Sequence, residues 1–377
     1  MPFLKRKKYS QEGRMVWYNF SFSSAMKVLW IGLVLFLLSL TVHTNEYSVR
    51  SLYGENKLFI ITLDGLRWQE VFKGADSALI HHPAFNTDVV NAKALYWAPT
   101  QEERRKKLMP FFWNIIARQG ELYGNRERNN LMNVANPYAL SYPGYSELLT
   151  GYVDLTIFNN GKTPNKNLSV LEVLNASATY QNKVAAFTSW DAFPYILNKE
   201  KSTIFINSGF ESLPGRNLSA TESYINTIQT EIEDQKNVRY DELTYLACRE
   251  YIQKNKPSVV FLSLGGTDEA AHQGKYDQYL QQANNADRMI SELWQYVQTL
   301  PEYVNQTTFL ITTDHGRGAS PDNWYTHGVL VDGSSQIWMG LLGHAIQAQG
   351  EKTNRQQFYL KNVKELMLKI LAFQQQP

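Results

Sequence analysis

Cysteine is almost missing from this chain: Cys248 is the only one among 377 residues. A single thiol cannot form an internal disulfide, and it excludes a metal site built from several cysteines. Cys248 lies in the amphipathic stretch ELTYLACREYI, so we expect it to be a packed core thiol. A secreted protein without disulfides is compatible with a bacterial envelope.

An excess of charge of one sign is also missing, since the sequence has 37 basic and 35 acidic residues and a net charge of +2. This balance gives no reason to expect a nucleic-acid partner. Internal repeats and low-complexity runs are absent too. What is present is 44% apolar and 19% charged residues, enough for a sizeable core in one large domain or two ordinary ones.

The charge is unevenly placed, because residues 1–44 hold six basic residues and one acid, which leaves −3 for the rest. An apolar run of 15 residues, VLWIGLVLFLLSLTV at 28–42, follows this basic front. It is shorter than the roughly 20 residues of a membrane span and predicts a signal peptide, with cleavage near Thr44, or a retained N-terminal anchor. Met26 would then be the natural start and residues 1–25 a mis-called extension. We therefore expect export to the periplasm or cell envelope, with membrane contact only through an uncleaved segment.

Strand-like and helix-like segments alternate along the rest of the chain. Continuous apolar runs predict buried strands at 57–65, 183–189, 257–266, 307–316 and 336–343, and amphipathic stretches predict helices, the longest at 276–300. Residues 73–107 are expected to be polar and irregular. This order predicts an α/β fold, with a mostly parallel sheet covered by helices on both faces and functional groups at the C-terminal strand ends.

Acids and histidines follow directly on three of these strands. They are Asp64, then Asp268 and His272, then Asp314 and His315, with a further His327-Gly328 on a loop. Asp268 and His272 at i,i+4 would share one helix face. Carboxylates that converge on one point repel unless a cation lies among them. Carboxylate and imidazole donors suit zinc and, less exclusively, manganese or iron.

Each piece alone has an ordinary explanation, because an Asp at a strand end is often a helix N-cap. The ordered set nevertheless resembles the alkaline phosphatase superfamily, nearest its nucleotide pyrophosphatase/phosphodiesterase-like envelope phosphatases, over residues 57–345. The resemblance rests on Asp64-Gly65, Ser141-Tyr142-Pro143-Gly144, Asp268-x-x-x-His272, Asp314-His315-Gly316 and His327-Gly328. It implies that residues 45–377 form one catalytic domain, with a mixed, mostly parallel sheet between helices and a small irregular cap. It also implies two zinc ions, one held by Asp268, His272 and His327, the other by Asp64, Asp314, His315 and Ser141.

The same resemblance makes Ser141 the nucleophile. A free serine hydroxyl attacks poorly, and coordination to zinc makes it reactive near neutral pH; an ordinary N-cap serine is the alternative. The family often places an asparagine some twenty residues later, for which Asn160 is the candidate, although a loop asparagine also serves as a turn former. Weaker candidates for substrate contacts are Arg67 and Lys162 as phosphate ligands and Trp324 and Tyr325 as pocket walls.

Tyr145 separates the subclasses. The sulfatase branch uses C/S-x-P-x-R, and here Tyr145 stands where the arginine belongs, so sulfatase activity is disfavoured. The resemblance thus implies a metal-dependent hydrolase of phosphate mono- or diesters that forms a phosphoseryl intermediate on a phosphorylated small molecule or lipid. A phosphotransferase and a non-catalytic binding protein that keeps the fold are the alternatives.

Overall fold

The computed structural model describes residues 56–232 and 237–373. The predicted signal peptide or anchor at residues 1–44 lies outside these two stretches. Within them, no helix combines the length and apolar character that crossing a bilayer requires.

A sheet of eight strands forms the centre, in the order β5-β4-β6-β1-β7-β8-β2-β9. The strands are β1 (Lys57–Leu63), β2 (Gly120–Tyr123), β4 (Val184–Thr188), β5 (Phe205–Ser208), β6 (Val259–Leu264), β7 (Thr307–Thr312), β8 (Met339–Gly343) and β9 (Gly350–Glu351). Neighbouring strands pair in parallel except around β8, which is antiparallel to both β7 and β2. The predicted mixed, mostly parallel sheet is confirmed.

The central strand β1 explains why this sheet needs helices on both faces. All seven of its residues are buried. Successive side chains of a strand point to opposite faces, and in β1 Phe59 and Ile61 join one apolar cluster while Leu58 and Ile60 join another. A sheet with two apolar faces is stable only when helical layers cover both.

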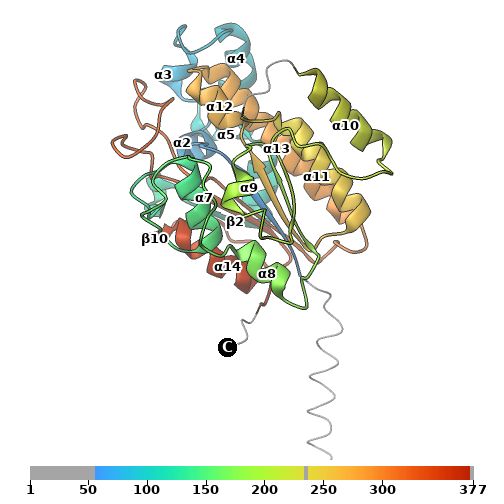
Figure 1. Cartoon of the computed structure of the whole chain (residues 1–377). Helices are drawn as coiled ribbons and strands as arrows, with labels where there is room; N and C mark the ends of the chain where they lie inside the picture. The colour runs from blue at the N-terminus through green and yellow to red at the C-terminus, as the bar shows by residue number, and fades with distance from the viewer. Residues whose placement is uncertain (1–55, 233–236, 374–377) are drawn as a thin grey trace, which may run out of the picture. The chain divides into compact units, whose positions relative to one another are not determined.

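Two helical layers supply this cover, and Figure 1 shows α11 and α13 on one side of the sheet and α8 and α14 on the other. The first layer contains α2 (Trp68–Lys73), α10 (Ala220–Glu231), α11 (Asp241–Asn255), α12 (Gly266–His272), α13 (Tyr276–Gln298) and a π-helical turn, η1 (Phe112–Ile116), followed by α6 (Ala117–Gln119). The second contains α7 (Ser141–Thr150), α8 (Val170–Ala176), α9 (Phe193–Ile196), η3 (Leu360–Asn362) and α14 (Val363–Ile370). A small two-stranded sheet pairs β3 (Asn130–Asn133), which follows η2 (Arg126–Arg128), with β10 (Gln356–Tyr359).

The prediction of an irregular segment at residues 73–107 is wrong. The structure has three helices there, α3 (Ser77–Ile80), α4 (Val89–Tyr96) and α5 (Gln101–Leu108). Asp76, Asp88 and Thr100 cap their first turns by accepting backbone N–H hydrogen bonds. Capping residues outweigh the weak apolar periodicity of such short, polar helices.

The fold brings four strand ends to one edge. The neighbours β4, β6, β1 and β7 run in parallel, so their carboxyl ends meet at the same side of the sheet. The residues that follow these strands therefore lie close together, although they come from distant parts of the chain.

Candidate metal centre

Two carboxylates and one imidazole form a buried cluster at this edge, which we call the inner subsite: Asp64, Asp314 and His315. Asp64 follows β1, and Asp314 and His315 follow β7. Nε2 of His315 lies 3.4 Å from Oδ1 of Asp64 and 3.4 Å from Oδ2 of Asp314. All three side chains are at most 6% exposed. The three donor atoms lie within 4.8 Å of one another, a spacing that allows them to hold a single ion.

A second cluster, the outer subsite, consists of Asp268, His272 and His327. Asp268 and His272 lie one turn apart on α12, and His272 Nε2 is 3.1 Å from Asp268 Oδ2. His327 reaches the cluster from the loop between β7 and β8, with Nε2 at 3.2 Å from His272 Nε2 and 3.9 Å from Asp268 Oδ1. The His272 side chain is 47% exposed, so this cluster is open to solvent.

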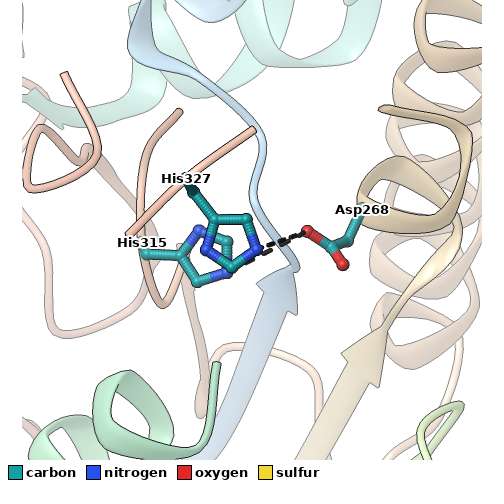
Figure 2. Close-up of side chains that lie close together, drawn as sticks. All are labelled: Asp268, His315 and His327. Atoms are coloured by element: carbon teal, nitrogen blue, oxygen red, sulfur yellow. Dashed lines mark ion pairs between the residues drawn. The ribbon is translucent and has the colours of Figure 1, made fainter. Parts of the chain in front are cut away.

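His315 joins the two subsites. Figure 2 shows its ring stacked on that of His327, with Asp268 facing both from α12. The ring centroids are 3.9 Å apart and the planes differ by 9°. Nε2 of His315 is also 4.0 Å from Asp268 Oδ1, so Asp268, His315 and His327 form a group as compact as the inner one. The two subsites therefore adjoin, and His315 is within reach of both.

The donor set fits a divalent cation. Oδ1 of Asp64 and Oδ2 of Asp314 are buried and have no hydrogen-bond partner, and both face His315 Nε2. The other oxygens of the same carboxylates are held in place: Asp64 Oδ2 accepts from the Tyr145 hydroxyl at 3.0 Å, and Asp314 Oδ1 accepts from the Gly65 N–H at 3.2 Å. Buried acceptors without donors are rare. One oxygen held by the protein and the other left open is the pattern of a metal ligand.

The histidine tautomers agree with this interpretation. Nδ1 of His315 lies 2.9 Å from the Gly316 carbonyl oxygen, and Nδ1 of His327 lies 3.0 Å from that of Ala139. A carbonyl oxygen only accepts, so each Nδ1 carries the proton and donates it. Both Nε2 lone pairs are then directed into the two subsites, as metal-binding imidazoles require.

Without a cation, Asp314 and His315 hold their protons more tightly than usual. Burial, reinforced by the nearby Asp64, raises the pKa of Asp314 to about 8. Burial lowers the pKa of His315, but Asp314 and Asp64 outweigh it and raise that pKa to about 9. Burial, and then the charge of His315, lower the pKa of His327 and of His272. A divalent cation would supply the positive charge that a proton supplies in its absence.

Ser141 lies beside both subsites, as the first residue of α7. Its Oγ is 3.2 Å from His315 Nε2. The start of α7 packs tightly against the ligand loop, because a Cβ at Gly144 would lie 2.4 Å from the Asp314 carbonyl oxygen. Only glycine at residue 144 permits this approach. The motif Ser141-Tyr142-Pro143-Gly144 thus brings a hydroxyl group to the cluster.

A cavity of about 260 Å³ opens in front of the cluster. Asn160 and Lys162, predicted from the sequence as a catalytic residue and a phosphate ligand, line it from the loop between α7 and α8. Asn160 Oδ1 accepts from the Tyr142 N–H at 3.0 Å, and Lys162 Nζ pairs with Asp191 at 2.7 Å. The cavity is lined by Asp64, Ser141, Asn160, Lys162, Trp190, Asn237, Val238, Gly265, Asp268, Glu269 and His272.

Three of the weaker candidates do not reach this cavity. Arg67 is buried, and its guanidinium donates to Glu70 and to the Gly318 carbonyl oxygen, so it supports the fold instead of binding phosphate. Trp324 is fully buried against Tyr276 and Tyr279 and is a core residue. Tyr325 is 38% exposed and does not line the cavity. Arg67 and Trp324 are close in sequence to site residues, but each also contacts residues far away in sequence, which the sequence alone did not reveal.

Two buried residues beside the subsites were not assigned a role from the sequence. Arg317 forms an ion pair with Asp268 through Nη2 and donates from Nη1 to the Tyr325 carbonyl oxygen. Tyr145 donates to Asp64 and accepts from Ser263 Oγ at 3.1 Å. Two features of the sequence could have indicated these roles: Arg317 directly follows Asp-His-Gly, and Tyr145 replaces the arginine of the sulfatase motif.

Comparisons with known proteins agree with this geometry. A family model described as the Metalloenzyme superfamily matches residues 157–327, a stretch that contains the outer subsite, Asp314 and His315. No curated protein matches the sequence. Wild-type alkaline phosphatase PafA is similar in structure, with a TM-score of 0.55 at 10% identity over 85% of this chain and 96% of that one.

Two further solved structures share the fold. The lipoteichoic acid synthase LtaP from Listeria monocytogenes has a TM-score of 0.54 at 11% identity, over 85% of this chain and 72% of its own. A putative sulfatase from Bacteroides thetaiotaomicron has a TM-score of 0.52 at 10% identity, over 85% and 71%. Such low identity establishes the fold and leaves the reaction open. Residues 157–327 thus match a metalloenzyme family model, and the chain shares the fold of these solved structures.

Proposed function

We propose that this protein is a metal-dependent hydrolase of phosphate esters, with two zinc ions and Ser141 as the nucleophile. The observation that carries the proposal is the position of Ser141 Oγ, 3.2 Å from His315 Nε2 and beside the buried, partnerless oxygens of Asp64 and Asp314. Asp64, Asp314, His315 and Ser141 would hold the inner ion. Asp268, His272 and His327 would hold the outer one.

When bound, the two cations would supply Lewis acidity, which favours the alkoxide of Ser141 and stabilises negative charge on the oxygens of the substrate. Ser141 Oγ forms a bond to phosphorus, the ester bond breaks, and the alcohol leaves with the proton that serine gives up. Water then cleaves the phosphoseryl bond and restores the hydroxyl.

The chain itself would orient the phosphate. Oδ1 of Asn160 is engaged by the Tyr142 N–H, so the amide NH₂ is the part that can donate to an anion in the cavity. Lys162 lines the same cavity, where its ammonium group is paired with Asp191 at 2.7 Å. We expect a phosphorylated small molecule or lipid as substrate, no nucleic-acid partner, and an exported enzyme of the periplasm or cell envelope. Among the branches of the superfamily, the phosphodiesterase-like envelope phosphatases fit best.

Tyr145 disfavours a sulfatase. Tyr145 occupies the position at which the sulfatase motif has an arginine. Its side chain is fully buried and hydrogen-bonded to Asp64 and Ser263. A phosphotransferase uses the same site and differs only in the acceptor, which is an alcohol in place of water. A binding protein that keeps the fold would show no turnover at all.

The test is a paired assay of p-nitrophenyl phosphate and bis-p-nitrophenyl phosphate on the mature chain with added zinc, run with metal analysis. We expect Ser141→Ala to reduce turnover by roughly 10⁴-fold or more while metal content stays unchanged. Asp314→Ala should lose both metal and activity. Ser146→Ala is the matched control, because Ser146 lies on the same helix and is bonded to Asn165.

The outcomes separate the alternatives. Full turnover by Ser141→Ala removes Ser141 from its role, and unchanged zinc content in Asp314→Ala contradicts the ligand assignment. A rate that rises with added alcohol, with transfer of the phosphoryl group to it, identifies a phosphotransferase. A chain that binds two zinc ions and turns over neither ester contradicts the hydrolase proposal.

A further inference from the structure

Arg317 is the unusual residue of the metal centre, because it places a permanent positive charge next to a proposed cation site. Its side chain is fully buried, and its Nη2 is paired with Oδ1 of Asp268, the only carboxylate of the outer subsite. An arginine keeps its charge in essentially any protein environment. The mechanism above does not use this residue, and it does not line the cavity.

The two subsites consequently differ in charge. The inner subsite has two carboxylates, Asp64 and Asp314, whose free oxygens have no other partner. The outer subsite has one carboxylate, and the guanidinium of Arg317 offsets its charge. His272 and His327 add no negative charge, since neutral imidazole is the form that binds metal. Among its own residues, the inner subsite therefore offers a divalent cation two negative charges, and the outer subsite offers almost none.

The two subsites also differ in access to water. The inner side chains are at most 6% exposed, whereas the His272 side chain is 47% exposed. Interactions between charges weaken as solvent enters, so the exposed subsite also holds its ion less firmly. Charge and exposure thus act in the same direction.

We propose that the metal centre is asymmetric: the inner cation is held permanently, and the outer cation exchanges with the surroundings because Arg317 offsets the charge of Asp268. The proposal rests on the proposed function for the identity of the ions. It extends that function, since turnover by such an enzyme would follow the free concentration of the outer cation while the inner ion stays in place.

Zinc binding alone tests the asymmetry, without any substrate. The purified mature chain is stripped of metal and titrated with zinc against a chromophoric chelator. We expect two steps whose dissociation constants differ by at least about 100-fold. Asp314→Ala should abolish the tight step, and His272→Ala should abolish only the weak one. Two equal sites in the unaltered protein, or loss of the tight step in His272→Ala, would overturn the proposal.

The role of Arg317 needs two substitutions at that residue. Arg317→Met removes the charge at similar length, and Arg317→Lys keeps it. We expect the Met variant to bind the outer zinc at least about 10-fold more tightly, and the Lys variant to bind it like the unaltered protein. A weaker outer site in Arg317→Met would show that Arg317 only positions Asp268, and this would refute the charge argument.

A variant that fails to fold does not remove the test, because the two-step titration of the unaltered protein and of His272→Ala stands by itself. The failure of this inference is also distinguishable from failure of the proposed function. Equal zinc sites with full ester turnover contradict only the asymmetry, whereas a two-step titration without turnover contradicts only the hydrolase.

Discussion

At the scale of single residues, Tyr145, which stands where the sulfatase motif has an arginine, orients the proposed metal ligand Asp64. Its hydroxyl donates to Asp64 Oδ2 and accepts from Ser263 Oγ, which leaves Asp64 Oδ1 open toward His315. Burial raises the pKa of Tyr145 well above its ordinary value, and the charges of Asp314 and Asp64 add to the effect. The hydroxyl therefore keeps its proton and remains a donor at neutral pH.

We predict that Tyr145→Phe weakens zinc binding by about 10- to 100-fold, the usual effect of removing a hydrogen bond to a metal ligand. The fold should persist, with a loss of unfolding free energy of about 1–3 kcal/mol for the unpaired carboxylate oxygen. Competition titration with a chelator and chemical unfolding measure the two effects. Tyr142→Phe is the control, since the Tyr142 hydroxyl donates to the Thr163 carbonyl oxygen. Zinc affinity that is equal in the two variants would exclude a role for Tyr145.

At the scale of elements, α13 fixes the start of the π-helical turn through one buried acid. Asp287 accepts from the Phe111 and Phe112 N–H groups at 2.7 and 2.9 Å. Burial raises its pKa to about 7, although the two hydrogen bonds act against the rise. The folded protein thus binds this proton more tightly than the unfolded chain, in which Asp titrates near its ordinary value.

The sign of the pH effect follows from that difference. Below the unfolded pKa of about 4, both states are protonated, and the contribution of Asp287 to stability is complete. It is lost as the pH rises through about 7, by at most about 4 kcal/mol. We predict that Asp287→Asn flattens the fall of unfolding free energy between pH 4 and 7, as measured by denaturant titrations at several pH values.

A second variant of α13 serves as the control for this effect. Asn284 donates to the Leu108 carbonyl oxygen and has no titratable group. Asn284→Ala should lower stability by the same amount at each pH. An unchanged pH profile in Asp287→Asn would mean that another group dominates the proton linkage.

The elements themselves were predictable to different degrees. The long helix expected at 276–300 and the strand expected at 57–65 are confirmed as α13 and β1, because each has strong periodicity or a continuous apolar run. The helices α3, α4 and α5 were missed, since their sequences are short and polar and depend on caps and on packing against other elements. Single-sequence patterns do not contain the partners that stabilise such helices.

At the scale of the whole molecule, the sheet gathers acids at one edge. Asp64 and Asp314 lie next to each other because β1 and β7 are neighbours in the sheet. Strand order could be inferred only in outline, yet the rule that parallel strands end at one edge was enough to group the ligands. It did not reveal that Arg67 and Trp324 are buried, because both make contacts with residues far away in the sequence: Arg67 donates to the Gly318 carbonyl oxygen, and Trp324 packs against Tyr279.

We predict that metal removal lowers the stability of the protein. A cation that binds only the folded state adds about 2.7 kcal/mol when its free concentration is 100 times the dissociation constant. Chelation should therefore lower the melting temperature by several degrees, and added zinc should restore it. Thermal unfolding followed by circular dichroism measures the shift.

Two variants define the outcome of this measurement. Ser141→Ala should show nearly the same shift, because it keeps all the carboxylate and imidazole donors. Asp314→Ala should show little shift, because it lacks one of them. A melting temperature that chelator leaves unchanged in the unaltered protein would contradict a resident ion at this edge.

The span of the two subsites along the chain has a consequence for biogenesis. Their residues run from Asp64, directly after β1, to His327, after β7, so a fragment that lacks the region around either residue cannot contain a complete centre. A ribosome must therefore release most of the polypeptide before any ion can be coordinated. For a chain exported in extended form, loading would take place only at the destination, from whatever metal that compartment provides.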